Sequence, residues 1–269
     1  ALQKGVSLTL QWPSTINDVG AYHTPALPVE VMNMLAIGPG TRCVDATLGD
    51  GGHASGILQA TAPYGKLLGI DADPQALDRA RKRLGAFGDR VILENDNFEN
   101  METIVTRHNF RPVLPVLMDL GLSSWQLDAG GRGFSFREGV GLDMRLSPEQ
   151  SITASDLVNT YSQREVERII SAYGEERQAR RIASAIVRQR PIATALQLAE
   201  VISSTVPRHG QRIHPATRTF QAIRVFVNRE LETLEAALDQ AVRVLEQGGR
   251  LVVIAYHSLD DRLIKTFMR

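Results

Sequence analysis

Five short, largely apolar runs recur along the chain and predict the strands of a sheet. They cover residues 42–46, 66–70, 90–93, 115–120 and 250–256. The last run is apolar at consecutive positions, which is typical of a strand buried on both faces of a parallel sheet. Amphipathic segments alternate with these runs, for instance residues 74–84, which begin with a proline. The pattern predicts a doubly wound α/β domain of Rossmann type, whose ligand lies at the carboxyl ends of the strands.

Carboxylates mark three of those strand ends, at Asp45, Asp71 and Asp119. The first of them, Asp45, begins the run Asp45-Ala-Thr-Leu-Gly-Asp-Gly-Gly-His53, a glycine turn that leads into a helix. Glycines allow the backbone to approach a ligand where a Cβ would collide, and Asp71 stands about 20 residues beyond the turn, where ribose hydroxyls are commonly bound. The sequence therefore predicts a site for a ligand that carries adenosine.

The glycine turn has three interpretations, and two of them concern the identity of its ligand. Gly49-x-Gly51-x-x-Ala54 satisfies the dinucleotide pattern, which would make the protein a nicotinamide dehydrogenase. Two acids favour S-adenosylmethionine instead: Asp45 inside the end of the first strand, and Asp119 at the end of a later one. A glycine turn that only closes a βα unit is the third reading.

The chain between Asp119 and the strand near residue 250 is longer than a crossover requires. An apolar stripe at steps of three and four predicts one helix over 215–246, ended by Gly248-Gly249, and this helix suffices for the crossover. Residues 125–214 therefore predict an inserted, all-helical domain, with capping boxes at Ser162-x-x-Glu165 and Thr194-x-x-Gln197. We expect methyltransferase-type segments at 21–124 and 215–269, and an insertion suited to substrate recognition.

Polar side chains gather at three places near the expected ligand. The glycine-rich loop 130–145 carries Arg132 and Arg145, and the helix that follows His214 presents polar side chains on one side: Thr217, Arg218, Gln221 and Arg224. His257 and Ser258 come just after the last strand, where they would contact substrate, relay a proton, or cap the next helix. All 13 basic residues of segment 130–220 are arginine, which suits either an RNA-binding face or a solvated helical surface.

Composition narrows the class of protein. The 269 residues are 43% apolar with zero net charge, and no apolar run is long enough for a membrane span. The single cysteine, Cys43, excludes an internal disulfide and a multi-cysteine metal site. We expect a protein without a metal, located in the cytoplasm or, alternatively, in an organellar matrix or stroma.

Several blocks of sequence together resemble the MraW/RsmH family of small-subunit ribosomal RNA methyltransferases, from His23 onward. The blocks are Asp45-x-Thr-x-Gly-x-Gly-Gly-His53, Asp71-x-Asp-Pro74, Met118-Asp-Leu-Gly-x-Ser-Ser-x-Gln-Leu127, Arg132-Gly-Phe-Ser-Phe136, Leu142-Asp-Met-Arg145, Tyr173-Gly-Glu-Glu176, His214-Pro-Ala-Thr-Arg-Thr-Phe-Gln-Ala-Ile-Arg224 and His257-Ser-Leu-Asp-Asp-Arg262. The resemblance implies a class I methyltransferase that moves a methyl group from S-adenosylmethionine to the exocyclic N4 of a cytidine. The target would lie in the decoding region of 16S-type rRNA, free or within a ribosomal particle.

The resemblance also implies a set of cofactor contacts, at Gly51, Gly52, His53, Asp71, Phe98, Asp119 and Gln126. Of these, Phe98 and Gln126 rest on the resemblance alone. Asp119 and His257 are the candidate catalytic residues, although we favour a role for Asp119 in holding the cofactor's amino group. The candidates for RNA contact are Arg132, Arg145, His214, Arg218, Gln221, Arg224 and Ser258.

The chain departs from the family in two respects. It ends at Arg269, before the basic tail that the family usually has, and residues 1–20 match no block, so we expect a fragment or a processed chain. The alternative functions are a non-catalytic assembly factor that binds S-adenosylmethionine or RNA, and a methyltransferase acting on another nucleic acid or on a small molecule. The sequence leaves the oligomeric state open, and a homodimer is one of the alternatives.

Overall fold

We describe the fold from a computed structural model of residues 24–269, excepting residues 129–130, 137–138 and 207–212. Residues 1–20, which match no family block, lie outside the described residues. The chain forms two compact units. The first contains the described residues up to Leu120 together with Asp239–Ala255, and the second contains Gly121–Leu238 together with Tyr256–Arg269.

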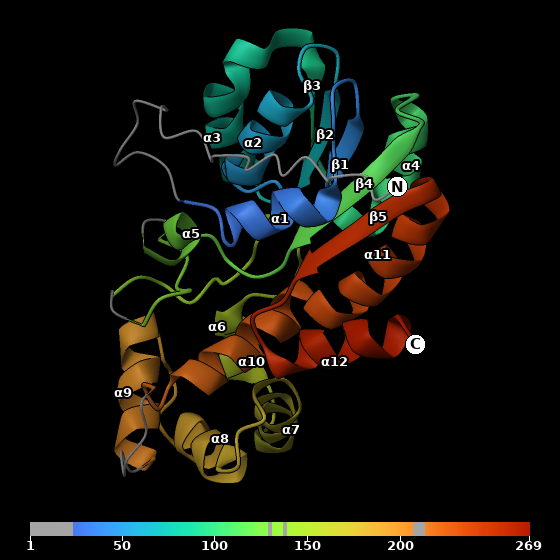
Figure 1. The fold of residues 1–269 in the computed structure, drawn as a ribbon. Coiled ribbons are helices and arrows are strands. Elements are labelled where there is room, and N and C mark those ends of the chain that lie inside the picture. Colours follow the sequence, from blue (N-terminus) through green and yellow to red (C-terminus); the bar gives the residue numbers. More distant parts are fainter. Residues whose placement is uncertain (1–23, 129–130, 137–138, 207–212) are drawn as a thin grey trace. The chain divides into compact units, whose positions relative to one another are not determined.

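The first unit is built on a parallel sheet with strand order β3-β2-β1-β4-β5 (Figure 1). The strands are β1 (Arg42–Asp45), β2 (Lys66–Asp71), β3 (Val91–Asn95), β4 (Val113–Asp119) and β5 (Leu245–Ile254). The strand order reverses between β1 and β4, and parallel sheets bind ligands at such a switch point. The predicted class, a Rossmann-like α/β fold with a parallel sheet, is confirmed.

Helices α1 (Pro28–Leu35), α2 (Gly52–Ala60) and α3 (Pro74–Leu84) share one apolar core with the sheet, while η1 (Gly85–Arg90), η2 (Phe98–Asn100) and α4 (Met101–Arg107) complete the connections. Ile57 and Leu58 of α2 are fully buried against this core, as is Leu67 of β2. Helix α3 begins and ends where the sequence predicts, because Asp73 caps its first turn and Pro74 cannot continue a helix backward.

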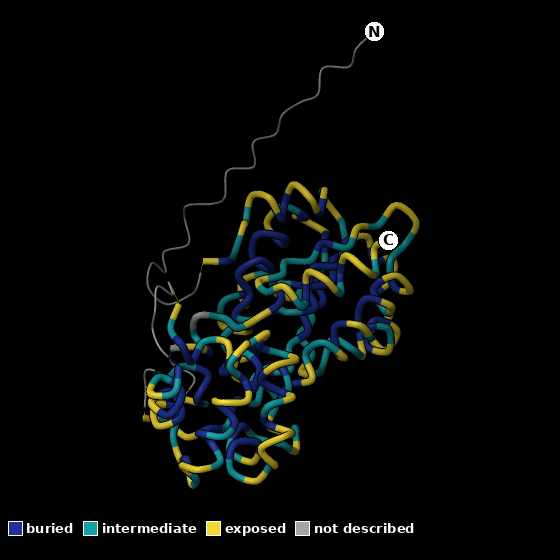
Figure 2. Tube along the Cα trace, turned by 90° about the horizontal axis from the view of Figure 1, so that it is seen from below, coloured by how far each residue is buried: buried dark blue, intermediate teal, exposed yellow. Residues whose placement is uncertain are grey.

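The second unit is helical. It contains α5 (Ser124–Asp128), α6 (Ala154–Thr160), α7 (Gln163–Gly174), α8 (Ala179–Arg188), α9 (Ala195–Thr205), α10 (Thr217–Asn228), the first part of α11 (Glu230–Val244), and α12 (Ser258–Phe267). The predicted capping boxes at Ser162 and Thr194 are confirmed. Figure 2 shows which residues along the chain are buried, intermediate or exposed. Helix α7 crosses α10 closely at Gly174, where a Cβ would stand 2.5 Å from the carbonyl oxygen of Arg218.

The prediction of a single helix over residues 215–246 is wrong. Helix α10 ends at Asn228, Arg229 adopts a left-handed φ of 51°, and α11 begins at Glu230. The apolar stripe continues through this break, which is why the pattern hides it. The Asn228 side chain, bonded to the carbonyl of Met144 and the N–H of Leu146, holds the chain at the break.

The predicted helix stop at Gly248-Gly249 is also wrong, since α11 ends at Val244 and β5 starts at Leu245. The register of β5 on β4 shifts between Val113 and Pro115. Gly248, with φ of 83°, and Gly249, whose Cβ would stand 2.6 Å from the Leu114 carbonyl, accommodate that irregularity. The two glycines therefore shape a strand rather than end a helix.

Candidate cofactor site and substrate residues

The loop between β1 and α2 wraps around buried polar groups. Asp45 is 1% exposed, and its carboxylate accepts a hydrogen bond from the N–H of Thr47 at 3.3 Å. The loop reaches the neighbouring strand as well, because the N–H of Leu48 donates to the carbonyl of Ile70 at 3.0 Å. These bonds hold the backbone of the glycine turn at the carboxyl end of β1, where a Rossmann-type fold binds its ligand.

Glycine is needed at two positions of this turn. Gly51, the residue before α2, has φ of 81°, and Gly49 has φ of 54°. Residues other than glycine rarely adopt such φ angles. A Cβ on Gly49 would meet no described atom within 4 Å, so the turn leaves open space on that side. A ligand can approach the backbone there.

Asp71 is tied into the same turn from the end of β2. One carboxylate oxygen accepts the N–H of Gly49 at 2.7 Å, and the other accepts the N–H of Asp73 at 2.8 Å. A carboxylate oxygen can accept more than one hydrogen bond. Asp71 thus orders the loop and still suits the hydroxyls of a ribose.

Asp119 and His53 meet beside the turn. The N–H of Asp119 donates to the hydroxyl oxygen of Thr47 at 2.6 Å, and its carboxylate lies 3.4 Å from Nε2 of His53. Within the described residues, the buried ring of His53 makes no hydrogen bond of good geometry at either nitrogen. Buried polar atoms normally have partners, so this ring is suited to a ligand's polar group.

The electrostatics of the site favour a cation. The pKa of Asp45 is raised to about 7, chiefly by burial and in smaller part by the carboxylates of Asp119 and Asp71, while His53 and the N–H of Thr47 oppose the shift. Mutual repulsion among three carboxylates is relieved by a positive ligand. The sulfonium and ammonium groups of S-adenosylmethionine fit this environment, whereas the pyrophosphate of a dinucleotide does not. The charge of Asp50, the fourth acid of the turn, is compensated by Arg83 at 3.0 Å.

The remaining cofactor candidates are Phe98, Gly52 and Gln126. Phe98 is half-buried at the start of η2, three residues after β3 ends. Gly52 opens α2, where its Cβ would stand 3.2 Å from the Pro25 side chain. Gln126 belongs to the helical unit, is 6% exposed, and accepts the N–H of Ser123 through its side chain at 3.0 Å. The structure thus gathers His53, Asp71 and Asp119 around one turn.

Three of the candidate RNA contacts are engaged within the helical unit. Arg145 binds the Asp143 carboxylate with two nitrogens, Arg132 donates to the carbonyls of Arg145 and Leu146, and Arg224 makes a bidentate pair with Glu230 at 2.7 and 2.8 Å. These side chains hold their own loop or helix break together. The spacing of polar residues alone does not reveal such pairings.

Two further candidates for RNA contact, His214 and Gln221, lie near the start of α10. The ring of His214 stacks on Phe136 with centroids 4.4 Å apart, and its Nδ1 accepts the N–H of Ala216 at 3.2 Å. Gln221 is half-buried on the same helix.

His257 and Ser258 start α12. His257 is the N-cap residue of this helix, and its Nδ1 faces the N–H of Asp260 at 3.4 Å, which supports the capping interpretation. The hydroxyl of Ser258 donates to the carboxylate of Glu175, which also accepts Arg262 at 2.7 Å. Arg218 approaches the carbonyl of Glu175 at 3.4 Å.

Thr47 and Glu175 are the two residues that sequence reasoning did not single out. Thr47 joins Asp45 to Asp119, which lie on adjacent strands 74 positions apart in the sequence. Glu175 has a left-handed φ of 48° after α7. The only sequence signal for either is its position inside a family block.

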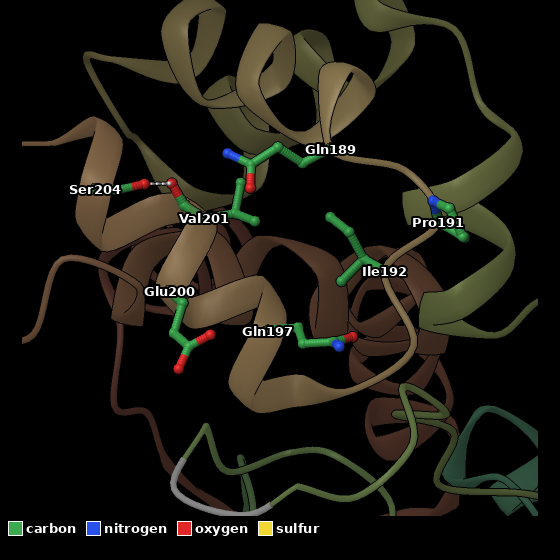
Figure 3. Close-up of a pocket in the computed structure, with 7 residues that line it drawn as sticks. All are labelled: Gln189, Pro191, Ile192, Gln197, Glu200, Val201 and Ser204. Carbon is green, nitrogen blue, oxygen red and sulfur yellow. Dashed lines mark hydrogen bonds between the residues drawn. The ribbon is translucent and has the colours of Figure 1, made fainter.

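A cavity of about 360 Å³ lies in the helical unit, between the segment that follows α8 and helix α9 (Figure 3). It is lined by Gln189, Pro191, Ile192, Gln197, Glu200, Val201 and Ser204. None of the predicted site residues lines it. Within the described ranges, no cluster of three or more histidine, cysteine or acidic side chains could hold a metal ion, and no helix has the length and apolar character needed to cross a membrane.

Comparison with known proteins identifies close relatives. The chain is 52% identical over 248 residues to "Ribosomal RNA small subunit methyltransferase H" of Dehalococcoides mccartyi, covering 92% of this chain and 71% of that protein. It is 49% identical over 254 residues to the protein of the same name from Symbiobacterium thermophilum, covering 92% of this chain and 80% of that one. A solved structure described as a putative rRNA-methylase from Clostridium thermocellum aligns over 89% of this chain and 77% of that chain, with 18% identity and a TM-score of 0.44.

The model of the MraW methylase family matches residues 20–269, which include the glycine turn and all three strand-end carboxylates. This match confirms the expectation of S-adenosylmethionine as the cofactor, in agreement with the acidic surroundings of the turn. With nearly the whole chain covered and curated relatives at about half identity, the protein belongs to the MraW methylase family.

Proposed function

We propose that this protein transfers a methyl group from S-adenosylmethionine to the exocyclic N4 of a cytidine in the decoding region of small-subunit rRNA. The observation that carries the proposal is the close similarity to several proteins named as small-subunit rRNA methyltransferases. The acidic surroundings of the glycine turn, at Asp45, Asp71 and Asp119, support S-adenosylmethionine as the methyl donor. The resemblance noted in the sequence supports cytidine as the target nucleoside and the decoding region as its location.

Several residues would hold the cofactor. The backbone of Gly49–Gly52 would border its amino-acid end, Asp71 would accept the ribose hydroxyls, and Phe98 would flank the adenine. Asp119 and His53 would face the positively charged groups, since the Asp119 backbone is fixed by Thr47. The sulfonium group supplies the electrophilic methyl when the cofactor is bound.

The protein's own contribution is positioning and exclusion of water. Cytosine N4 is a weak nucleophile, because its lone pair is delocalised into the ring. An acceptor that holds the amino hydrogens would turn the lone pair toward the methyl group. Asp119 is one candidate acceptor, although its closeness to His53 and its effect on Asp45 favour the cofactor role.

The helical unit would recognise the RNA. We propose the inserted segment 125–214 as the substrate-recognition part, within a compact unit that also takes in residues up to Leu238 and α12. The target base must be unstacked before N4 is accessible, since that group is hydrogen-bonded in a duplex. The remaining candidates for contact with the RNA strand are His214, Arg218, Gln221 and Ser258.

Labelled-methyl transfer tests the function. The protein is incubated with labelled S-adenosylmethionine and small ribosomal subunits, and the product is digested with RNase or with DNase. We expect label that RNase releases and DNase does not. A non-catalytic assembly factor would bind cofactor and subunits without transferring label, and a methyltransferase acting on another nucleic acid would leave the rRNA unlabelled.

A pair of variants assigns Asp119 and His257. We expect Asp119→Ala to weaken cofactor binding as well as turnover, and His257→Ala to leave cofactor binding unchanged, since that ring caps α12. If Asp119→Ala abolishes turnover while cofactor affinity stays at the wild-type value, Asp119 acts on N4 and not on the cofactor.

A further inference from the structure

Helix α8 exposes a row of arginines. Its buried face consists of Ala179, Ile182, Ala183, Ala185 and Ile186. At 100° per residue, the opposite side presents Arg180, Arg181, Ser184 and Arg188, and the three arginines are exposed. Arg177 precedes the helix by two residues and is exposed as well. We call these four arginines the α8 arginine row. Helix α8 itself contains no acidic residue.

Little within the unit compensates this charge. Arg181 donates to the side chain of Gln178 at 2.9 Å, and in the part of the chain that the structure describes the other three arginines have no hydrogen-bond or ion-pair partner. This contrasts with Arg145 and Arg224, which are paired with carboxylates.

The acidic residues nearest to the row form no ion pair with it in the described part of the chain. Glu175 accepts Ser258 and Arg262, and the carboxylate of Glu176 accepts the N–H of Gln178 at 2.8 Å. On the α9 side, Glu200 lines the cavity shown in Figure 3, and among the described residues no ion pair joins it to the row.

The arrangement works against the helix on its own. Arg177, Arg180 and Arg181 crowd like charge at the start of α8, whereas Arg188 stands seven positions after Arg181. Arg180 and Arg181 also stand in the first turn of α8, where the helix dipole disfavours cations. A feature that opposes local preferences without a compensating contact marks a functional surface. An anionic partner would relieve both effects.

Resting on the proposed function, we propose that the α8 arginine row binds the phosphate backbone of rRNA through contacts that do not depend on base sequence. The planar fork of arginine matches phosphate in a bidentate manner. With a rise of about 1.5 Å per residue, Arg180 and Arg188 stand about 12 Å apart along the helix. One strand of a DNA duplex carries a phosphate about every 3.4 Å along the helix axis, and on that scale the row spans roughly three to four phosphates.

Salt dependence of RNA binding tests the proposal. The variant Arg177→Gln, Arg180→Gln, Arg188→Gln removes the three unpaired charges, and glutamine has a helix propensity close to that of arginine. The matched control removes three exposed basic charges from the other unit, by Arg81→Gln, Lys82→Gln and Arg107→Gln. Fluorescence anisotropy measures the Kd for 16S rRNA fragments between 50 and 200 mM salt, roughly the range in which phosphate contacts dominate affinity.

We expect the α8 variant to bind RNA at least about tenfold more weakly at low salt, and the slope of log Kd against log salt to fall by about 2, since each of the three lost contacts contributes about 0.7 on a single strand. Its affinity for S-adenosylmethionine should stay at the wild-type value. The inference is overturned if the slope is unchanged, or if the control variant loses as much affinity as the α8 variant. If the wild-type protein neither binds nor methylates rRNA, the proposed function fails first.

Discussion

Replacing Asp45 by asparagine isolates the energetic cost of burying its carboxylate in the cofactor site. The side chain is 1% exposed, and its pKa is raised from 3.8 to about 7, chiefly by burial. A group whose pKa is higher in the folded state stabilises the fold fully below the unfolded pKa, and this contribution is lost as pH rises toward the folded pKa. Wild-type stability therefore falls as Asp45 loses its proton.

The size of the effect follows from the pKa values. Each pH unit between the unfolded and folded pKa corresponds to about 1.4 kcal/mol of unfolding free energy. Between pH 5.5 and pH 8.5, as we choose them, only the part below the folded pKa counts, roughly 1.5 units, or about 2 kcal/mol. Asparagine does not titrate and keeps an oxygen that can accept the N–H of Thr47.

The assay is urea denaturation of the cofactor-free protein at both pH values. We expect the free energy of unfolding of wild type to fall by about 2 kcal/mol more than that of Asp45→Asn, which corresponds to roughly 4–8 °C in thermal melts. Asp78→Asn, an exposed carboxylate on α3, serves as the control and should behave as wild type. A stability difference between Asp45→Asn and wild type that is the same at both pH values would refute the reasoning.

Three further substitutions test other parts of the structure. Gly49→Ala and Gly40→Ala both place a Cβ at positive φ in open space, so each should cost about 1–2 kcal/mol of stability; calorimetry should show a Kd for S-adenosylmethionine raised at least about tenfold only for Gly49→Ala, and equal Kd values would remove the turn from the site. A double-mutant cycle of Arg224→Ala and Glu230→Ala should yield a coupling of about 1–2 kcal/mol in denaturation experiments, since the pair is bidentate and largely buried; additive effects would contradict a structural role. Hydrogen bonds from Ser258 and Arg262 hold the pKa of Glu175 below its usual range, so its stabilising effect is present above the unfolded pKa and is lost as pH falls. Glu175→Gln should therefore lower the Tm at pH 7 and less at pH 4, whereas an equal loss at both would contradict the pairing.

The sequence predicts local features of the fold well, because they depend on neighbouring residues. Asp73 and Pro74 define the start of α3, and the capping boxes at Ser162 and Thr194 define two helix starts. The strand-end acids of the site were visible for the same reason, since each directly follows an apolar run. The break at Arg229 was not, because the contacts that hold it come from residues more than 80 positions away.

The candidate site was predicted unevenly. The glycine turn, Asp71 and Asp119 follow from residue patterns, whereas Phe98 and Gln126 rest on family resemblance, since a lone aromatic or amide side chain has no local signature. Arg145 and Arg224 show why the RNA contacts were harder to predict. A polar side chain at the right spacing can be bound in an ion pair within its own loop or helix break, and the side-chain conformations that decide this are not encoded in the spacing.

Mass spectrometry of the methylated nucleoside distinguishes N4-methylation of cytidine from every other methylation of the rRNA. Small ribosomal subunits that lack the modification are incubated with this protein and labelled S-adenosylmethionine, and the rRNA is then digested to nucleosides and compared with standards. We expect label in N4-methylcytidine. Label in 5-methylcytidine, in a 2′-O-methylated nucleoside, or in none would contradict it.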